Sequence, residues 1–265
     1  MCTLIAFHQV WNDAPLVVAT NRDEAYDRPS APPRWLDGEP AALAPLDERA
    51  GGTWMGANER GLWVGLTNRR AEAHDPCLRS RGLLCRELLG AESAVAAVAR
   101  LESLEERYNP FHVVVADLER MVLVEHEAGR SSARRLPPGC HVVTNRPFDE
   151  TPEEPKARRA WRLLYRSGLW PVEGGSHAPP DLESRLMAVL GDHGEEGRDA
   201  ICLHGGHYGT KSAAVWQISP LEPPGAARVT LAFAAGPPCS TAFSPFGQDE
   251  SGQPAVRVDG VESSG

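Results

Sequence analysis

Short apolar runs rich in β-branched residues occur in adjacent pairs along this chain, and a few turn-forming residues separate the members of each pair. The three clearest pairs are residues 3–10 with 16–20, residues 53–57 with 62–67, and residues 112–116 with 121–125. Asn12, Asp13 and Pro15 mark the first turn, and Gly61 ends the second loop where a positive φ angle suits the turn. Strands joined by such short loops pair with each other, so the sequence predicts antiparallel hairpins.

Helical blocks interrupt these hairpins, and regular alternation of single strands with single helices is scarce. Apolar spacings of three and four residues predict helices over residues 79–101, 155–168 and 181–192, the first of them broken near Gly90. Further strands are expected over residues 140–144, 213–218 and 228–233, and the proline-rich residues 27–50 are expected to be irregular. The pattern favours an α+β fold, most simply sheets sandwiched between layers of helices.

Length and composition bound the domain organisation. The chain of 265 residues has the composition of an ordinary globular protein, so one compact domain is expected over residues 1–247. Residues 248–265 are rich in Gly, Ser and Asp, and we expect a flexible C-terminal tail there.

The charge balance narrows the range of partners. The 27 basic and 36 acidic residues give a formal net charge of −9, which argues against a nucleic acid or an anionic membrane surface as partner. No stretch approaches the roughly 20 apolar residues of a membrane span, and residues 1–10 lack the features of a signal peptide. We therefore expect a cytoplasmic protein with a small-molecule substrate, and the oligomeric state stays open.

Six cysteines are scattered along the chain without a Cys-x-x-Cys pair, which indicates neither a disulfide framework nor a zinc ribbon. Cys202, His204 and His207 lie close together in the sequence, but their spacing matches no standard zinc site. No metal is expected. Of the six, Cys2 is the unusual one because it directly follows the initiator methionine.

The expected pairing of the first hairpin brings polar residues to the start of the chain. If the turn is centred near Asn12 and Asp13, Cys2 lies opposite Asp23 and beside the polar run 21–24. The same reasoning on the second hairpin places Asn68 opposite Gly51, where two glycines leave space for a ligand. Both hairpins thus predict polar groups at a sheet edge.

Cys2 has a specific chemical use if Met1 is removed, as a small second residue normally permits. Its α-amine, with an ordinary pKa of about 7.7–8.0, can then take the proton of a thiol whose ordinary pKa is about 8.5. One residue would supply both the nucleophile and the base, and Arg22 nearby would favour the thiolate. Asp23 is suited to hold the α-ammonium or the leaving amine. The side-chain amides of Asn68 and Asn145 can stabilise an oxyanion.

Several motifs occur in a recognisable order over residues 2–145. They are Met1-Cys2, Asn21-Arg22-Asp23-Glu24, Arg28-Pro29-Ser30, Gly51-Gly52-Thr53-Trp54-x-Gly56, Gly61, Leu66-Thr67-Asn68, Ala116-Asp117 and Thr144-Asn145. In this order they resemble the NRDE family, also called transport and Golgi organisation 2. That family is similar in turn to the cysteine N-terminal nucleophile (Ntn) hydrolases that include penicillin V acylase and choloylglycine hydrolase.

The resemblance implies a four-layer αββα sandwich with Cys2 as nucleophile, Asp23 as its amine partner, and Asn68 and Asn145 as ligands of the oxyanion. The substrate-binding residues expected around them are Asn21, Arg22, Gly51, Gly52, Trp54 and Lys211. Lys211 stands where the wider superfamily has an arginine, and a lysine lacks the planar fork of that side chain.

More ordinary interpretations of the same residues stay open. Cys2 is also typical of a buried thiol at a strand start. Arg22 with Asp23 is also typical of an ion pair at a sheet edge, and asparagines such as Asn68 and Asn145 often end strands in turns.

The leading functional hypothesis is an Ntn-type cysteine hydrolase that cleaves a linear amide or thioester of a small acyl compound and uses no cofactor. One alternative is a non-catalytic carrier of haem or acyl-coenzyme A, because haem handling has been attached to the family resembled. In that case Cys202, His204 or His207 would be candidate haem ligands. The other alternative is an acyltransferase, in which an amine or thiol replaces water.

Overall fold

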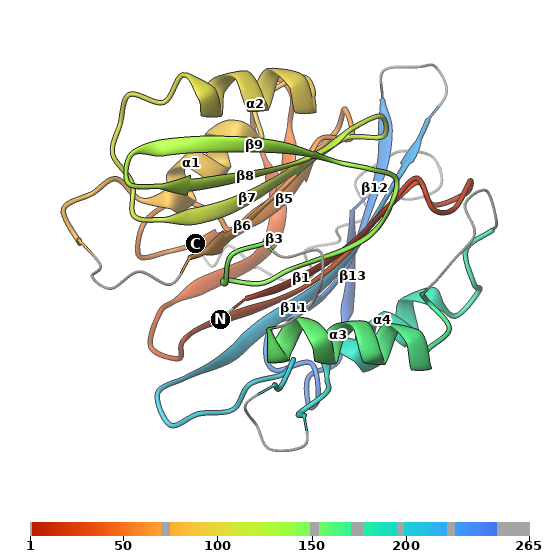
Figure 1. Cartoon of the computed structure of the whole chain (residues 1–265). Helices are drawn as coiled ribbons and strands as arrows, with labels where there is room; N and C mark the ends of the chain where they lie inside the picture. Colours follow the sequence, from red (N-terminus) through yellow and green to blue (C-terminus); the bar gives the residue numbers. More distant parts are fainter. Residues whose placement is uncertain are drawn as a thin grey trace, which may run out of the picture.

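The computed structural model describes residues 2–69, 75–148, 154–170, 177–194, 199–221 and 226–247. Over these residues the chain forms two antiparallel sheets and four α-helices (Figure 1). The predicted C-terminal tail, residues 248–265, lies outside the described residues.

The first sheet has six strands in the spatial order β10-β1-β2-β11-β12-β13. Its strands are β1 (Thr3–His8), β2 (Leu16–Ala25), β10 (Gly139–Val143), β11 (Tyr208–Pro220), β12 (Ala227–Ala234) and β13 (Ser244–Gly247). The first predicted hairpin is therefore confirmed and lies near the centre of this sheet. The long strand β11 pairs with β2 along almost all of its length, including the polar end of β2.

The second sheet has seven strands in the spatial order β3-β4-β5-β6-β7-β8-β9, each next to its neighbour in sequence. Its strands are β3 (Ser30–Leu36), β4 (Ala42–Asp47), β5 (Met55–Asn58), β6 (Trp63–Asn68), β7 (Phe111–Ala116), β8 (Met121–Glu127) and β9 (Arg130–Leu136). The second and third predicted hairpins are confirmed as β5–β6 and β7–β8.

The helices lie where the apolar spacing predicts them. They are α1 (Arg81–Leu88), α2 (Ala94–Glu102), α3 (Pro155–Arg166) and α4 (Leu182–Leu190). The break near Gly90 is confirmed, because Ser93 caps a new helix by accepting a hydrogen bond from the backbone of Ala96. None of the helices in the described segments is both long and apolar enough to cross a membrane.

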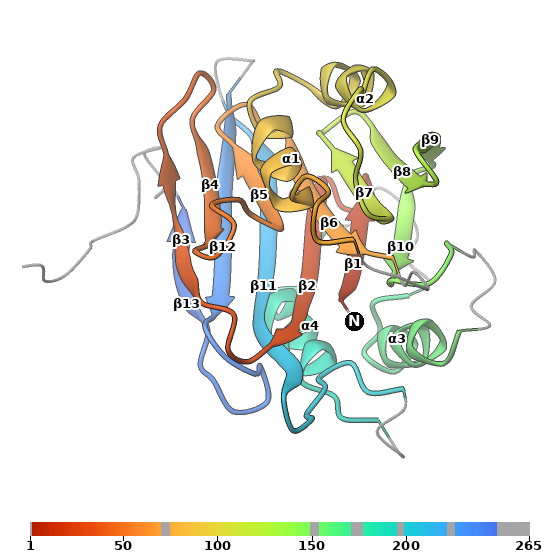
Figure 2. The same cartoon turned by 90° about the vertical axis from the view of Figure 1, so that its left-hand side faces the viewer.

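The two sheets stack face to face, and each carries a pair of helices on its outer face (Figure 2). Alternation along β1 shows how one strand serves two layers: Leu4 and Ala6 pack between the sheets, whereas Ile5 and Phe7 pack against α3 and α4. A separate apolar cluster joins the other sheet to α1 and α2. The fold is thus a four-layer αββα sandwich, as expected.

One expectation of the sequence analysis is wrong, and two strands were not predicted. Residues 27–50 are not irregular, because they contain β3 and β4. Proline disfavours central strands, but β3 is an edge strand and its pairing shifts between Ala31 and Arg34, around the two prolines. The strands β9 and β13 were not expected at all; β9 is highly polar, and β13 has only four residues.

The pairing of the two hairpins also differs from the expectation. Thr3 pairs with Asn21, so the register places Cys2 opposite Arg22 and not opposite Asp23. Met55 pairs with Gly65, so continuing the β5–β6 register places Asn68 opposite Gly52 and not opposite Gly51. Both differences arise in the loops: the hairpin registers are shifted by one residue, and β5 begins only at Met55.

Candidate active site

The polar end of β2 places successive side chains on opposite faces of its sheet. The Arg22 guanidinium lies over the Trp54 ring at 4.0 Å from its centroid, between the two sheets. The flanking residues face the helices, because Asn21 donates to the carbonyl oxygens of Leu190 and Ile201, and Asp23 pairs with a residue of α3. The end of β2 thus supplies both Asn21, which hydrogen-bonds to the end of α4, and the charged groups of Arg22 and Asp23.

Asp23 is held by two buried side chains. The Lys156 Nζ lies 2.8 Å from one carboxylate oxygen, and the Thr210 hydroxyl donates to the other oxygen at 2.6 Å. The Tyr208 hydroxyl donates to the backbone oxygen of Asp23 at 2.6 Å. Asp23, Lys156 and Thr210 are exposed by 3%, 1% and 0%, so this carboxylate is fixed from α3 and β11 together. A buried pair of this kind is costly to desolvate, and its bonds must be well made to persist.

Cys2 lies directly before β1 and is partly buried. Burial raises the pKa of its thiol, and the Asp23 carboxylate raises it further. The positive charge of the chain's N-terminus acts in the opposite direction, as do, to a smaller extent, a hydrogen bond from the Asp23 backbone and the charge of Lys156. The net direction is upward, so the thiol needs a nearby base before it can act as a nucleophile.

Asn68 and Asn145 approach this end of β1 from different strands. Asn68 is exposed at the end of β6 and lines the same cavity as Cys2. Leu4 pairs with Val143, and continuing that register by two residues places Asn145 opposite Cys2. The Asn145 side-chain oxygen is buried without a hydrogen-bond partner among the described residues. The predicted set of Cys2, Asp23, Asn68 and Asn145 therefore converges on one end of the sandwich.

A cavity of about 460 Å³ opens beside Cys2 between the two sheets and the start of α1. Its charged lining consists of five arginines and three carboxylates, namely Arg22, Arg28, Arg49, Arg79, Arg81, Asp23, Glu24 and Asp47. Trp54, Thr53 and Leu66 contribute part of its less polar wall. The excess of arginine makes this cavity suited to an anionic group, even though the chain as a whole is acidic.

Two of these arginines differ in how their charge is used. Arg28 forms an ion pair with Asp47 at 2.6 Å; burial alone would raise the pKa of Asp47, but bonds and charge from Arg28 lower it. Burial lowers the pKa of Arg22, whose nearest carboxylate is Glu24 at 3.8 Å. The Arg22 Nη1 is buried and has no hydrogen-bond partner among the described residues. Such an unmatched donor beside a cavity points to a ligand that would complete it.

The remaining predicted binding residues have structural contacts. Asn21 holds the end of α4, and Lys211 donates to the carbonyl oxygens of Tyr26 and Arg28. Gly51 adopts a positive φ of 70° in the turn after β4. At Gly52, a side chain would collide with the backbone at the start of α1, because an added Cβ would lie 2.2 Å from the Gly82 carbonyl carbon. Substrate binding by these four residues stays a prediction.

The sequence analysis missed Lys156 and Thr210. Lys156 lies in a helix of strongly basic sequence, and no feature of the sequence separates it from the solvated basic residues around it. Thr210 directly precedes Lys211, the residue for which the resemblance implies a binding role. Regular alternation along β11 could not have found it, because the pairing with β2 shifts between Thr210 and Ser212 and the strand is irregular at Lys211.

Comparison with known proteins places the chain among relatives. The family described as Transport and Golgi organisation 2 matches residues 1–220. A Transport and Golgi organization 2 homolog of Mus musculus is 28% identical over 231 residues, covering 76% of this chain and 80% of the relative. A Homo sapiens homolog is 31% identical over 206 residues, covering 73% of this chain and 71% of the relative.

Among solved structures, a Caenorhabditis elegans ortholog of N-acylethanolamine-hydrolyzing acid amidase superposes with a TM-score of 0.54 at 14% identity. The match covers 81% of this chain and 92% of that protein. At this identity the likeness concerns the fold alone, which is that of the Ntn hydrolases.

Proposed function

This chain belongs to the Transport and Golgi organisation 2 family and has an Ntn-hydrolase fold, and on that basis we propose that it hydrolyses a linear amide or thioester of a small acyl compound through Cys2. The observation that carries the proposal is the position of Cys2. Cys2 lines a cavity and interacts electrostatically with the Asp23 carboxylate, which two other buried side chains fix in place.

In the first step, removal of Met1 gives Cys2 a free α-amine. The amine takes the thiol proton, and the sulfur attacks the substrate carbonyl carbon to form a carbon–sulfur bond. The developing oxyanion would be stabilised by donors from the side-chain amides of Asn68 and Asn145. Continuing the pairing of β1 with β10 places Asn145 opposite Cys2, on the side from which its amide N–H groups could donate.

In the second step, the tetrahedral intermediate collapses, and the bond to the leaving amine or thiol breaks as the α-ammonium returns its proton to that group. The products are the free leaving group and an acyl thioester on Cys2. Water, deprotonated by the same α-amine, then attacks the thioester carbonyl and releases the carboxylic acid. The thiol is regenerated, and no metal or redox group is required.

Asp23 acts in this scheme by orienting the α-ammonium. A carboxylate has about four lone-pair directions, so the bonds from Lys156 and Thr210 leave capacity for a third donor. Lys156 also offsets the negative charge, which would otherwise oppose formation of a thiolate beside Asp23.

The lining of the cavity supports a substrate class. Arg22 has an unmatched buried donor, and Arg81 donates to a neutral acceptor, the carbonyl oxygen of Pro110. Both arginines line the cavity, so a carboxylate, sulfonate or phosphate on the substrate would find donors there. We therefore expect an anionic acyl compound to be preferred over a neutral one of equal size.

The test is a panel of matched acyl amides and thioesters, neutral and anionic, with products measured by mass spectrometry. The wild-type chain is expected to release the free acid, and Cys2→Ser is expected to lower kcat by about 10³-fold or more. Cys77→Ser is the matched control, because Cys77 is an exposed thiol that does not line the cavity. Equal turnover by wild type and Cys2→Ser would refute the proposal.

The same protein distinguishes the alternatives. Added amines or thiols that divert the acyl group from water would indicate an acyltransferase. Absence of any acyl product, together with a stoichiometric Soret shift on haem addition that Cys2→Ala leaves unchanged, would favour the haem carrier.

A further inference from the structure

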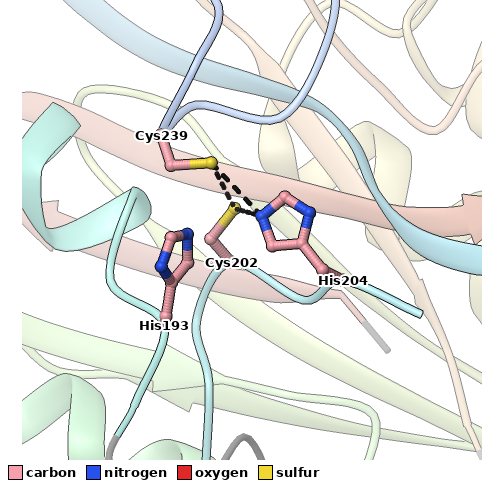
Figure 3. A group of neighbouring side chains, drawn as sticks. All are labelled: His193, Cys202, His204 and Cys239. Atoms are coloured by element: carbon pink, nitrogen blue, oxygen red, sulfur yellow. Dashed lines mark hydrogen bonds between the residues drawn. The ribbon is translucent and has the colours of Figure 1, made fainter.

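Four potential metal ligands from three separate segments meet at the surface, close to the end of the six-stranded sheet (Figure 3). His193 follows α4, Cys202 and His204 precede β11, and Cys239 lies between β12 and β13. The sequence analysis considered only Cys202 and His204 of this group and expected no metal. The other two ligands are too distant in the sequence to suggest a motif.

The separations within this cluster suit a tetrahedral ion. The Cys202 and Cys239 sulfurs are 3.7 Å apart, and the His204 Nε2 lies 3.5 Å from Cys202 and 3.2 Å from Cys239. With zinc–sulfur bonds of about 2.3 Å and zinc–nitrogen bonds of about 2.0–2.1 Å, neighbouring tetrahedral ligands lie about 3.3–3.8 Å apart. Three ligands thus already stand near the expected spacing.

His193 is the fourth member. All four ligand atoms lie within 4.8 Å of one another, and the imidazole rings of His193 and His204 have centroids 5.0 Å apart. His193 is exposed, so a small rotation of its side chain can bring a ring nitrogen to bonding distance without repacking the core.

The backbone around the cluster is well braced. The Ile201 and Cys202 amides both donate to the Asp192 carbonyl oxygen, at 3.0 and 2.8 Å, which ties the segment of Cys202 to that of His193. The Asp192 carboxylate in turn pairs with Arg159 of α3 at 2.8 and 2.9 Å. The ligands are therefore presented by connected segments, and not by unrelated surface loops.

We propose that His193, Cys202, His204 and Cys239 bind one Zn²⁺ ion in a tetrahedral structural site. The two thiols release their protons to solvent, and the two imidazoles bind as neutral groups, so the occupied centre has no net charge. The set contains two sulfurs and no oxygen ligand, which disfavours Mg²⁺ and Ca²⁺.

The zinc site would also stabilise the candidate active site, because hydrogen bonds connect the segment of Cys202 and His204 to Asp23. Leu203, between two of the ligands, donates its backbone N–H to the Thr210 hydroxyl at 2.8 Å and accepts from the Thr210 backbone at 2.8 Å. The same hydroxyl donates to the Asp23 carboxylate. An ion that fixes Cys202 and His204 thereby fixes the residue that orients Asp23.

The experiment uses the full chain, purified under reducing conditions, stripped with chelator and titrated with Zn²⁺ or Co²⁺. We expect one zinc per chain, and Co²⁺ should give the intense visible bands of a tetrahedral site with a thiolate charge-transfer band. Cys239→Ser and His193→Ala should each weaken binding by more than about 100-fold, beyond the usual effect of losing an outer partner of a ligand. Cys77→Ser and His207→Ala are matched controls, and both should retain the metal.

Two further readouts keep the test decisive. Zn²⁺ should raise the melting temperature of the stripped wild-type chain but not that of Cys239→Ser, whose exposed position allows it to fold. The proposal is overturned if the reduced wild type binds no stoichiometric zinc or cobalt, if Cys239→Ser and His193→Ala bind the ion as tightly as the wild type, or if Cys202 and Cys239 are found joined as a disulfide. None of these readouts depends on acyl hydrolysis.

Discussion

The two sheets of the sandwich use the same device to hold their helices and differ in what lies beside it. In the six-stranded sheet, Asn21 donates to two carbonyl oxygens, those of Leu190 at the end of α4 and Ile201, at 2.8 and 2.9 Å. In the seven-stranded sheet, Asn58 donates to two carbonyl oxygens just after α1, at 2.9 and 2.8 Å. A buried asparagine is thus a structural anchor in both sheets.

The difference lies in the neighbouring residues. Asn58 is followed by Glu59 and Arg60, which are exposed, whereas Asn21 is followed by Arg22 and Asp23, both nearly inaccessible to solvent. Burying charges is costly, and an anchor does not require them. A single buried polar side chain such as Asn58 therefore indicates only a structural role, whereas a group of buried charged side chains beside a cavity indicates the candidate active site.

The largest expected effect comes from breaking the buried pair of Asp23 and Lys156. Lys156→Met leaves the carboxylate uncompensated and should lower the free energy of unfolding by about 3–5 kcal/mol, measured by denaturant unfolding. The double variant Asp23→Leu with Lys156→Met should recover much of that stability without recovering turnover. Full activity in the double variant would remove Asp23 from the mechanism.

The two anchors themselves come next. Asn21→Ala and Asn58→Ala each leave two buried carbonyl oxygens without their donor, and each should lower the free energy of unfolding by about 2–3 kcal/mol. Chemical denaturation of the two variants under the same conditions tests whether the two losses in the free energy of unfolding are equal. An effect at one site several times that at the other would show that the two anchors are not equivalent.

The ion pair of Arg28 with Asp47 predicts a pH dependence. The pKa of Asp47 is lowered in the folded chain, so its contribution to stability is complete above its unfolded pKa of about 3.9 and is lost as the pH falls through the folded value. Asp47→Asn should therefore reduce stability by about 1–2 kcal/mol at neutral pH and much less in acid. A constant difference over that acid range would contradict this assignment.

The smallest effect concerns the stacking of Arg22 on Trp54. A double-mutant cycle with Arg22→Met and Trp54→Leu should give a coupling energy of about 0.5–1 kcal/mol in thermal or chemical unfolding. Because the guanidinium also faces the cavity, Arg22→Met should raise KM more for anionic than for neutral acyl compounds. Equal changes for both kinds of substrate would remove Arg22 from substrate recognition.

Local patterns predicted most of the fold. Turn residues such as Gly61, together with apolar alternation, located three hairpins, and the break at Gly90 separated two helices. The strand β3 escaped prediction because Pro32 and Pro33 obscure it, and only tertiary structure shows that they lie at an edge. The predicted hairpin registers were wrong by one residue because the turn type sets the register, and the strand sequences do not specify the turn type.

The candidate site likewise contains a part that local pairing predicts and a part that it does not. Cys2 and Asp23 belong to one hairpin, so their proximity follows from local pairing. Lys156 and Thr210 reach Asp23 from segments more than 130 residues away, and Cys239 reaches the metal cluster from 35 residues beyond His204. Such contacts depend on the packing of whole layers, which a single sequence does not specify by local pattern.

In the proposed mechanism, Cys2 is the nucleophile and becomes one only after the loss of Met1. The most direct measurement treats the chain with an activated short-chain acyl ester, quenches it, and locates the acyl group by intact mass and peptide mapping. We expect one acyl group on Cys2 of chains that lack Met1, no acyl group in Cys2→Ala, and unchanged labelling in Cys77→Ser. Labelling at another residue, or equal labelling of chains that retain Met1, would contradict the proposed mechanism.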